Sequence, residues 1–296
     1  MEIGIIGAGR AGSALGTALA AAGHRITAVA DLIPERAACL AKELDASVLT
    51  PVGVVDASRV ILLAVPDGAI AATARQLALD LAGRRGKIFF HLSGACPAGL
   101  LAPLAAAGAV GSLHPLLAMA ERRTSAARLR RCYYAIEGMP AAVAAGRALV
   151  ESLGGRLLEL DAQAKVRYHA AAVLASNCLV GLVDVILGLY EDLGLDRERA
   201  REAVWPLLES TVANIRNLGL EQALTGPISR GDTATVAAHL AELAGTGGTA
   251  AMVYNVLSQA TVALAARAGR IDAEKAREFE ELLSTKGDQV WLRPSS

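Results

Sequence analysis

The first half of the chain alternates short β-branched apolar runs with alanine-rich segments whose apolar residues recur at a helical period. The predicted strands are Glu2–Ile6, Arg25–Ala30, Val60–Val65, Lys87–Leu92, Ala109–Leu113, Cys132–Ile136 and Arg156–Leu160. The predicted helices between them are Ala11–Ala22, Pro34–Glu43, Ala69–Ala82, Leu100–Ala107 and Ala141–Leu153. Such alternation is typical of βαβ units. We therefore expect an α/β domain with a doubly wound parallel sheet, covered by helices on both faces.

After Asp161 the pattern changes, and apolar residues recur only at the helical period. The predicted helices are Ala162–Leu193, Asp196–Leu218, Asp232–Leu243, Gly248–Ala268 and Asp272–Ser284. Glycine-bearing segments separate them, as helix stops do. The sequence therefore predicts two domains, an α/β domain over residues 1–160 and an all-α helical domain over residues 161–296.

Composition and charge narrow the class of protein. The chain has 296 residues, of which 53% are hydrophobic and 20% charged, so a disordered chain is excluded. Its 29 basic and 29 acidic residues balance, and this argues against nucleic acid or an acidic membrane surface as a partner. The four cysteines, Cys39, Cys96, Cys132 and Cys178, lack the spacing of metal ligands. We expect no metal site, and a reducing compartment.

The most apolar stretch, Tyr168–Tyr190, is interrupted by His169, Asn177 and Asp184. Its longest run without a formal charge is shorter than the ~20 apolar residues that a membrane-spanning helix needs. The stretch is hydrophobic on nearly all sides, which favours a helix buried in protein, against a second copy of the chain. Near Met1 the chain also lacks the basic residues with which an export signal starts. We therefore expect a cytoplasmic homodimer, joined through its helical domains, that does not bind membranes.

The first strand is followed by a glycine motif, Gly7-Ala8-Gly9-Arg10-Ala11-Gly12, which opens an alanine-rich helix. This is the context in which the pattern GxGxxG binds a dinucleotide. Gly7 permits a tight turn, Gly9 lets the backbone approach a pyrophosphate, and Gly12 lets helix and strand pack closely. The helix N-terminus then offers free N–H groups to the phosphates. The motif predicts a Rossmann-like domain; the alternative is a glycine turn that only packs.

Two further segments lie where the cofactor should bind. Asp31 ends the second predicted strand, where a carboxylate accepts hydrogen bonds from ribose hydroxyls and disfavours a 2′-phosphate. We therefore expect NAD(H) or NADP(H) as cofactor, with NAD favoured. Val65, Pro66 and Asp67 close the predicted strand Val60–Val65, at the carboxyl edge of the sheet where the cofactor should lie. The alternative for each aspartate is that it caps the helix that follows it.

Two histidines lie at the carboxyl ends of neighbouring predicted strands. His91 is followed by Leu92, Ser93 and Gly94, and His114 ends the segment Gly111-Ser112-Leu113-His114-Pro115. Ligands of open α/β sheets bind outside the carboxyl ends of the strands. This predicts Ser93 as a cofactor contact, with His91 and His114 at the substrate. The alternative is that each histidine only bonds a neighbouring carbonyl group.

The first predicted helix of the second domain carries several polar residues. Lys165, His169 and Ser176 fall within roughly 40° of one another on one helix face, while Asn177 lies about 120° round. Lys165 and His169 are direct neighbours that could serve as proton donor and orienting group. The alternative is that Lys165 is a solvated residue at a helix start.

A polar loop, Thr225–Asp232, separates two later helices. Its Arg230 could bind a substrate carboxylate through two parallel hydrogen bonds. Alternatively the loop has no such role, and Asp232 simply caps the next helix.

Taken in order, the segments GAGRAG, VPD, HLSG, GSLHP, YHAAAVLASN and LTGPISRGD resemble a bacterial family that joins a Rossmann-like domain to the domain of unknown function DUF2520. That family is similar to 3-hydroxyisobutyrate-type dehydrogenases and to ketopantoate, pyrroline-5-carboxylate and imine reductases. The resemblance implies an NAD(P)-dependent oxidoreductase, and some members are thought to be ketopantoate reductases of pantothenate synthesis.

The resemblance also assigns roles to residues. Lys165 matches the lysine that protonates the nascent alkoxide in ketopantoate and hydroxyisobutyrate enzymes. Those enzymes usually have an asparagine four residues later, where this chain has His169. The serine and glutamate of ordinary ketopantoate reductases have no clear counterpart. The segment GSLHPL is similar to a stretch of prephenate dehydrogenases.

We therefore expect a reductase of a small 2-oxo acid, ketopantoate being the leading candidate, with its active site between the domains. Lys165, His169 and Asn177 are the expected catalytic residues. The expected substrate contacts are His91, His114, Ser176 and Arg230. Imine reduction, prephenate-type oxidation and a non-catalytic dinucleotide-binding sensor are the alternatives.

Overall fold

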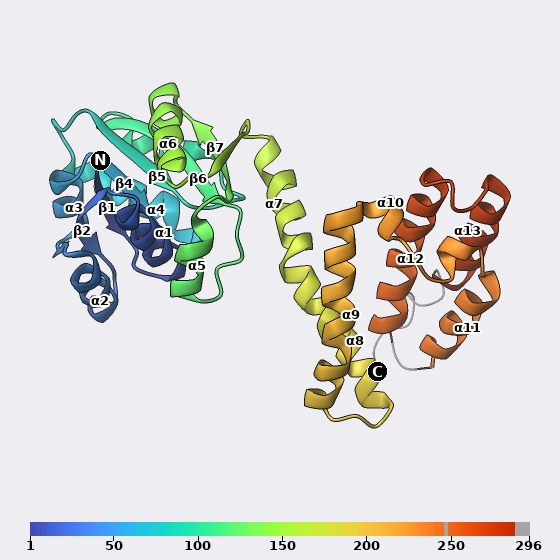
Figure 1. The fold of residues 1–296 in the computed structure, drawn as a ribbon. Helices are drawn as coiled ribbons and strands as arrows, with labels where there is room; N and C mark the ends of the chain where they lie inside the picture. The colour runs from blue at the N-terminus through green and yellow to red at the C-terminus, as the bar shows by residue number, and fades with distance from the viewer. Residues whose placement is uncertain (246–247, 288–296) are drawn as a thin grey trace. The chain divides into compact units, whose positions relative to one another are not determined.

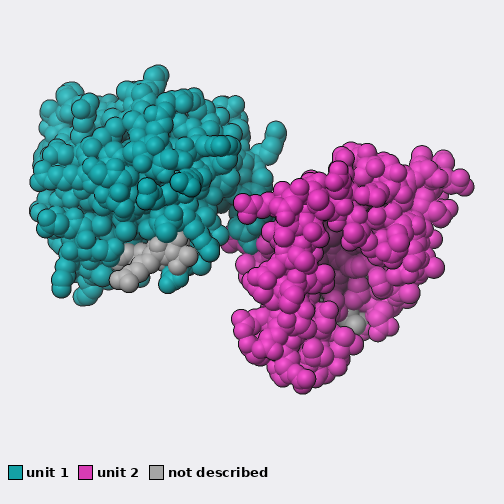
Figure 2. Space-filling model, in the orientation of Figure 1, with its two compact units in different colours: residues 1–176 teal, residues 177–296 magenta. Residues whose placement is uncertain are grey.

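The computed structural model describes residues 1–245 and 248–287. The chain forms two compact units, Met1–Ser176 and Asn177–Ser296, which Figure 2 shows in teal and magenta. The sequence places a domain boundary at residue 160, whereas the first compact unit runs on to Ser176 and includes the helix α7 (Ala164–Ala175).

The first unit is built on one eight-stranded sheet. Its strands are β1 (Glu2–Ile6), β2 (Arg25–Ala30), β3 (Ser47–Val48), β4 (Val60–Leu63), β5 (Lys87–His91), β6 (Gly108–Pro115), β7 (Tyr133–Gly138) and β8 (Arg156–Glu159). The strand order is β3-β2-β1-β4-β5-β6-β7-β8. Neighbouring strands are parallel except β6 and β7, which are antiparallel. The expected doubly wound sheet is confirmed, with one antiparallel pair that the sequence did not predict.

Helices flank this sheet (Figure 1). They are α1 (Arg10–Ala21), α2 (Pro34–Leu44), α3 (Pro51–Ala57), α4 (Asp67–Asp80), the 3₁₀ helix η1 (Ala98–Leu104), α5 (Arg122–Leu129) and α6 (Pro140–Ser152). Strand β4 shows why both faces are covered: Val60 and Leu62 belong to one apolar cluster, while Ile61 and Leu63 belong to the other. Because successive side chains of a strand point to opposite faces, the continuous apolar run predicts this burial on both sides.

The second unit is helical throughout the residues that the structure describes. Its helices are α8 (Asn177–Asp192), α9 (Arg197–Leu218), α10 (Leu220–Ala223), the 3₁₀ helix η2 (Ile228–Arg230), α11 (Thr233–Leu243), α12 (Thr249–Arg267) and α13 (Ala273–Gly287). One cluster of buried residues joins α8 to α9 through Leu187 and Val204. Another joins α11, α12 and α13 through Val236, Val262 and Phe279. The all-α prediction is confirmed.

The single helix expected over Ala162–Leu193 is instead two helices. Ser176 separates α7 from α8, since its φ of −127° and ψ of −75° are not helical. The prediction that Ser176 lies within a continuous helix with Lys165 was therefore wrong. The helix expected over Leu100–Ala107 is the 3₁₀ helix η1, which contains Pro103; proline removes a backbone donor and disrupts an α-helix.

The apolar surface of α7 and α8 is not buried within one chain. In the span Ala164–Asp192, only 6% of the most apolar window is buried, and Val180 is 72% exposed. The expectation that this stretch is buried against a second copy of the chain stays a prediction. Among the described residues, this span and Thr249–Arg267 are long and apolar enough to cross a membrane, a test that core helices of soluble proteins also pass.

Candidate active site

In the glycine turn between β1 and α1, two of the three motif glycines have no room for a side chain, and the third faces open space. Gly7 has a φ of +105°, and a side chain there would also clash with the backbone of Ala64. A Cβ at Gly12 would clash with the carbonyl oxygen of Gly7. A Cβ at Gly9, by contrast, would meet no atom within 4 Å. Packing thus requires glycine at positions 7 and 12, while the open space at Gly9 lets a ligand approach the backbone.

The N-terminus of α1 is open to an anion. Its N-cap is Gly9, and no side chain caps the first turn. The hydroxyl of Ser13 donates to the carbonyl oxygen of Ala8 at 2.9 Å, so it does not occupy the free N–H groups. Arg10 is exposed and Ala11 partly buried at the start of the helix. With the positive end of the helix dipole, this cradle suits a diphosphate.

Asp31 binds the glycine turn. Its Oδ2 accepts a hydrogen bond from the backbone N–H of Ala8 at 2.6 Å, and its Oδ1 accepts one from Ile33 at 2.8 Å. The N-cap of α2 is Ile33, with no side-chain cap, so Asp31 is not the cap of this helix. The carboxylate therefore lies at the turn, where the sequence placed the ribose of a dinucleotide.

The ends of β4 and β5 are joined by side chains. Asp67 is the first residue of α4, after the half-buried Val65 and the N-cap Pro66. Its Oδ2 accepts a hydrogen bond from the hydroxyl of Ser93 at 2.8 Å. The same hydroxyl oxygen accepts from the backbone N–H groups of Ala95 and Cys96. Asp67 thus holds the loop after β5 rather than capping α4.

The ring of His91 also forms hydrogen bonds with the loop after β5. Its Nε2 lies 3.1 Å from the carbonyl oxygen of Pro97, and its Nδ1 lies 3.2 Å from the backbone nitrogen of Ser93. Nδ1 accepts the Ser93 N–H, and Nε2 donates to the Pro97 carbonyl. Burial lowers the pKa of His91 to about 4, so the ring is neutral at physiological pH. These contacts favour the alternative in which His91 bonds a neighbouring carbonyl group.

Lys165 is fully buried, with 0% of its surface exposed. Its Nζ donates to Ser112 Oγ at 2.6 Å and to the carbonyl oxygen of Ser93 at 3.2 Å. Burial lowers the pKa of the Lys165 ammonium, an effect that the negative charges of Glu137 and Asp67 partly oppose. The alternative of a solvated lysine was wrong. Helix α7 instead places the buried Lys165 side chain at the carboxyl end of β5, beside Ser112 of β6.

Next to Lys165, two further residues of α7 contact His114. The Tyr168 hydroxyl lies 2.8 Å from His114 Nδ1, and the ring of His169 meets His114 edge-on at 5.7 Å between centroids. Burial, together with the neighbouring His169 and Lys165, lowers the pKa of His114 to about 4. Burial raises the pKa of Tyr168 to about 12. At neutral pH the Tyr168 hydroxyl keeps its proton and His114 is uncharged.

Sequence reasoning missed several members of this group. Ser112 lies two residues before His114, and the alternation of a strand puts both on one face, so a signal was available. Tyr168 is three residues after Lys165, a spacing that also marks helix neighbours. Glu137 gave no signal, because its strand pairs antiparallel with β6 and sets it opposite Ser112. Its Oε2 accepts a hydrogen bond from the backbone of Ala98 at 2.7 Å.

The remaining predicted residues do not join this group in the first unit. Ser176 ends α7, and its hydroxyl donates to the carbonyl oxygen of Ala172 at 2.7 Å. Asn177 begins α8 in the second unit and is exposed. Arg230 is exposed in η2, and Asp232 beside it caps α11. Contacts of Asn177, Ser176 and Arg230 with a substrate therefore stay predictions.

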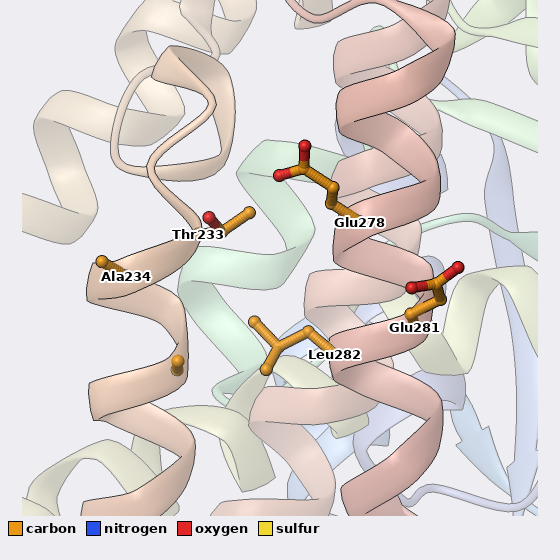
Figure 3. A pocket seen from close by; sticks show the side chains of 6 residues that line it. Thr233, Ala234, Glu278, Glu281 and Leu282 are labelled. Carbon is orange, nitrogen blue, oxygen red and sulfur yellow. The ribbon is translucent and has the colours of Figure 1, made fainter.

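A pocket of the second unit lies apart from these residues in the sequence. Its volume is about 480 Å³, and Figure 3 shows it between α11 and α13. It is lined by Thr233, Ala234, Ala237, Glu278, Glu281 and Leu282. None of them is a predicted site residue. In the described part of the chain, no group of three or more His, Cys, Asp or Glu side chains is placed to hold a metal ion.

Two family models match the chain: a Rossmann-like domain over residues 1–115 and the domain of unknown function DUF2520 over residues 132–261. A search of the curated proteins finds no match.

Solved structures share the fold along most of the chain. Protein TM1727 from Thermotoga maritima is 22% identical, with a TM-score of 0.71, over 90% of this chain and 98% of that one. The candidate NADP oxidoreductase BF3122 from Bacteroides fragilis is 21% identical, with a TM-score of 0.65, over 97% and 98%. The 1-pyrroline-5-carboxylate reductase of Streptococcus pyogenes is 16% identical, with a TM-score of 0.61, over 97% and 98%. At these identities the likeness shows the fold.

Proposed function

Because the chain belongs to the proteins that join a Rossmann-like domain to a DUF2520 domain, we propose that it is a nicotinamide-dependent reductase of a small 2-oxo acid. One observation carries the proposal: Lys165 is fully buried on two oxygen atoms, one just after the end of β5 and one on Ser112, the β6 residue that pairs with the last residue of β5, in the same unit as the glycine turn. A buried ammonium at the ligand-binding edge of an α/β sheet is typical of a catalytic group. Ketopantoate is the leading candidate substrate.

The residues of the glycine turn fit a dinucleotide. The free N–H groups at the start of α1 would hold its diphosphate, and the open space at Gly9 leaves room for it. Asp31, beside Ala8, would meet the ribose hydroxyls, which favours NAD over NADP. When bound, the nicotinamide supplies or accepts a hydride.

Lys165 would act as the general acid. An ammonium has three N–H donors, and Ser112 Oγ and the Ser93 carbonyl take two of them. The third can donate to the carbonyl oxygen of the substrate and transfer its proton to this oxygen as negative charge develops there. The lowered pKa of Lys165 makes this proton easier to release.

The residues around Lys165 hold the oxygen atoms that it contacts in fixed positions. Ser112 Oγ donates to the Ser93 carbonyl oxygen at 3.2 Å while it accepts from Lys165, so both oxygens are held in place. His91 and His114 are neutral, because burial lowers both pKa values to about 4. Lys165 is then the cation that a substrate carboxylate or carbonyl would meet first.

Reduction of a carbon–nitrogen double bond is a second candidate. It is favoured by the shared fold with the pyrroline-5-carboxylate reductase of Streptococcus pyogenes, at 16% identity. A substrate screen separates the two candidates, because an imine reductase would reduce cyclic imines faster than 2-oxo acids.

The exposed apolar surface of α7 and α8 supports a homodimer. Val166, Leu174 and Val180 are each more than two-thirds exposed in the single chain. A second copy packed against them would bury this surface, which water otherwise contacts at a cost of roughly 25 cal/mol per Å². We place the dimer in the cytoplasm, where the four free cysteines would stay reduced.

The experiment is a spectrophotometric screen of 2-oxo acids, ketopantoate first, with NADH and NADPH in parallel. We expect turnover of at least one oxo acid, with the NADH rate the higher of the two. Lys165→Ala should lower turnover by about 10²–10⁴-fold, the usual contribution of a positioned proton donor. Binding of NADH in calorimetry without turnover of any oxo acid or imine would instead indicate a non-catalytic sensor and overturn the proposal.

A further inference from the structure

His169 carries an atom that the hydrogen bonds of the site do not satisfy. Its Nδ1 is buried without a hydrogen-bond partner, which is true of no other side-chain nitrogen or oxygen in the described residues. Buried polar atoms are nearly always paired, so an unpaired one needs a physical explanation.

The residue that covers this atom is Gly94, in the loop after β5. A Cβ at residue 94 would lie 2.5 Å from His169 Nδ1 and 3.0 Å from His114 Nε2. The φ of Gly94 lies outside the left-handed region, so its conformation does not require glycine. Glycine is required here because of space. The backbone of Gly94 lies directly against the two imidazole rings, and any side chain at this position would displace them.

This contact selects one tautomer of His169. A neutral imidazole carries one N–H and one lone pair. An N–H at Nδ1 would point at the Gly94 backbone and find no acceptor, at a cost of about 1–3 kcal/mol. A lone pair there costs less, because it can accept a weak contact from the Gly94 Cα–H group. The ring proton is therefore favoured on Nε2.

We propose that Gly94 is a positioning residue that holds His169 as its Nε2–H tautomer, and that His169 thereby donates a hydrogen bond to an oxygen of the substrate. This inference rests on the proposed function, and it specifies the substrate as an anion with oxygen atoms that accept hydrogen bonds. The Nε2–H group of His169 then gives the site a neutral N–H donor on the same helix as the Lys165 ammonium, one turn away from it. The carboxylates of Asp67 and Glu137 already accept hydrogen bonds from Ser93 and Ala98. Such a site recognises acceptor oxygens, as in a 2-oxo acid anion, in preference to a protonated imine.

The first test reads the tautomer without substrate. Two-bond ¹H–¹⁵N correlation spectra of histidine-labelled protein at neutral pH distinguish Nε2–H from Nδ1–H rings, and His169→Gln assigns the His169 signal. We expect the Nε2–H pattern in the wild-type protein. Gly94→Ala should replace it with a mixture of both tautomers, because the added Cβ displaces the ring. Gly99→Ala is the matched control, since a Cβ at residue 99 meets no atom within 4 Å, and should leave the pattern unchanged.

The second test uses the shapes of the amide side chains. Glutamine can place its N–H near the position of Nε2, whereas asparagine reaches only the position of Nδ1. His169→Gln should therefore keep kcat/KM for the oxo acid within about 10-fold of wild type, and His169→Asn should lose about 10-fold more, mainly through KM. Equal losses in the two variants would contradict the inference.

The two proposals fail in different ways. If His169 is charged or carries its proton on Nδ1 in the wild-type spectrum, the inference is wrong even if the enzyme reduces oxo acids. If the Nε2–H pattern is present and no 2-oxo acid is reduced, the tautomer assignment to Gly94 holds, but the proposed function and the substrate contact of His169 are wrong.

Discussion

Nζ of Lys165 lies 2.6 Å from Oγ of Ser112, although 53 residues separate the two along the chain. Lys165 stands in the first turn of α7 and Ser112 in the middle of β6, so the hydrogen bond attaches the helix to the sheet. Nothing in the composition of either segment requires this contact. It joins α7 to the sheet of the first compact unit, and with the hydrogen bond to the Ser93 carbonyl it places the ammonium beside the end of β5.

Replacement of Lys165 by methionine should separate stability from activity. Methionine has a similar length and no charge, so it removes the desolvation penalty of a buried ammonium without leaving a cavity. We expect Lys165→Met to unfold at the same temperature as wild type or higher, while turnover falls by about 10²–10⁴-fold. Thermal unfolding and initial rates measure the two quantities. A marked loss of thermal stability would show that Lys165 acts chiefly as a structural tie between α7 and the sheet.

Stability should fall in acid because of His91. Its pKa is lowered from 6.5 to about 4, so between these pH values the unfolded chain binds more protons than the folded one. The contribution is complete above pH 6.5 and is lost as the pH falls toward 4. One pKa unit corresponds to about 1.4 kcal/mol, so the loss is a few kcal/mol at most. Urea unfolding at several pH values should give a shallower pH dependence for His91→Gln than for wild type; identical slopes would contradict the assignment.

Substitution of Gly12 should lower folding stability, whereas substitution of Gly9 should weaken NADH binding. Gly12→Ala forces a Cβ against the backbone of Gly7, so we expect a loss of folding stability of about 1–3 kcal/mol, as overpacking usually costs. Gly9→Ala adds a methyl group in open space, so it should fold like wild type within about 1 kcal/mol but bind NADH more weakly. Thermal unfolding and calorimetric titration provide both measurements. Unchanged NADH affinity in Gly9→Ala would place the diphosphate elsewhere.

The fold was largely predictable because its signals are local. The apolar runs of β1, β4 and β5 are continuous, and only strands buried on both faces show such runs. Among the elements that were missed, β3 has only two residues, Ser47 and Val48, and the sequence of α5, RRTSAARL, shows no helical apolar pattern. The antiparallel placement of β7 beside β6 depends on tertiary contacts that no short segment encodes.

For the site, residue types were easier to predict than partners. Lys165, His114 and Ser93 lie together, as their places at strand and helix ends indicated. The sequence did not show that Lys165 is buried, because the residues around it also fit a lysine that is exposed to solvent in the first turn of a helix. Nor did it show that Gly94 is needed for space, since a glycine after a strand usually marks a turn.

The apolar face of α8 should form the dimer interface. Val180 is 72% exposed in the single chain, so a charge there would cost the monomer nothing, whereas in a dimer it would bury an unpaired carboxylate at a cost of several kcal/mol. We expect wild type to be a dimer by light scattering at micromolar concentration, and Val180→Glu to be a folded monomer or a much weaker dimer. Leu79→Glu is the matched control, since Leu79 is 74% exposed on α4 of the first unit; it should leave the dimer intact. If Val180→Glu and wild type give the same molecular mass, the interface lies elsewhere. If wild type itself is a monomer, the apolar surface of α8 is not covered by a second copy of the chain.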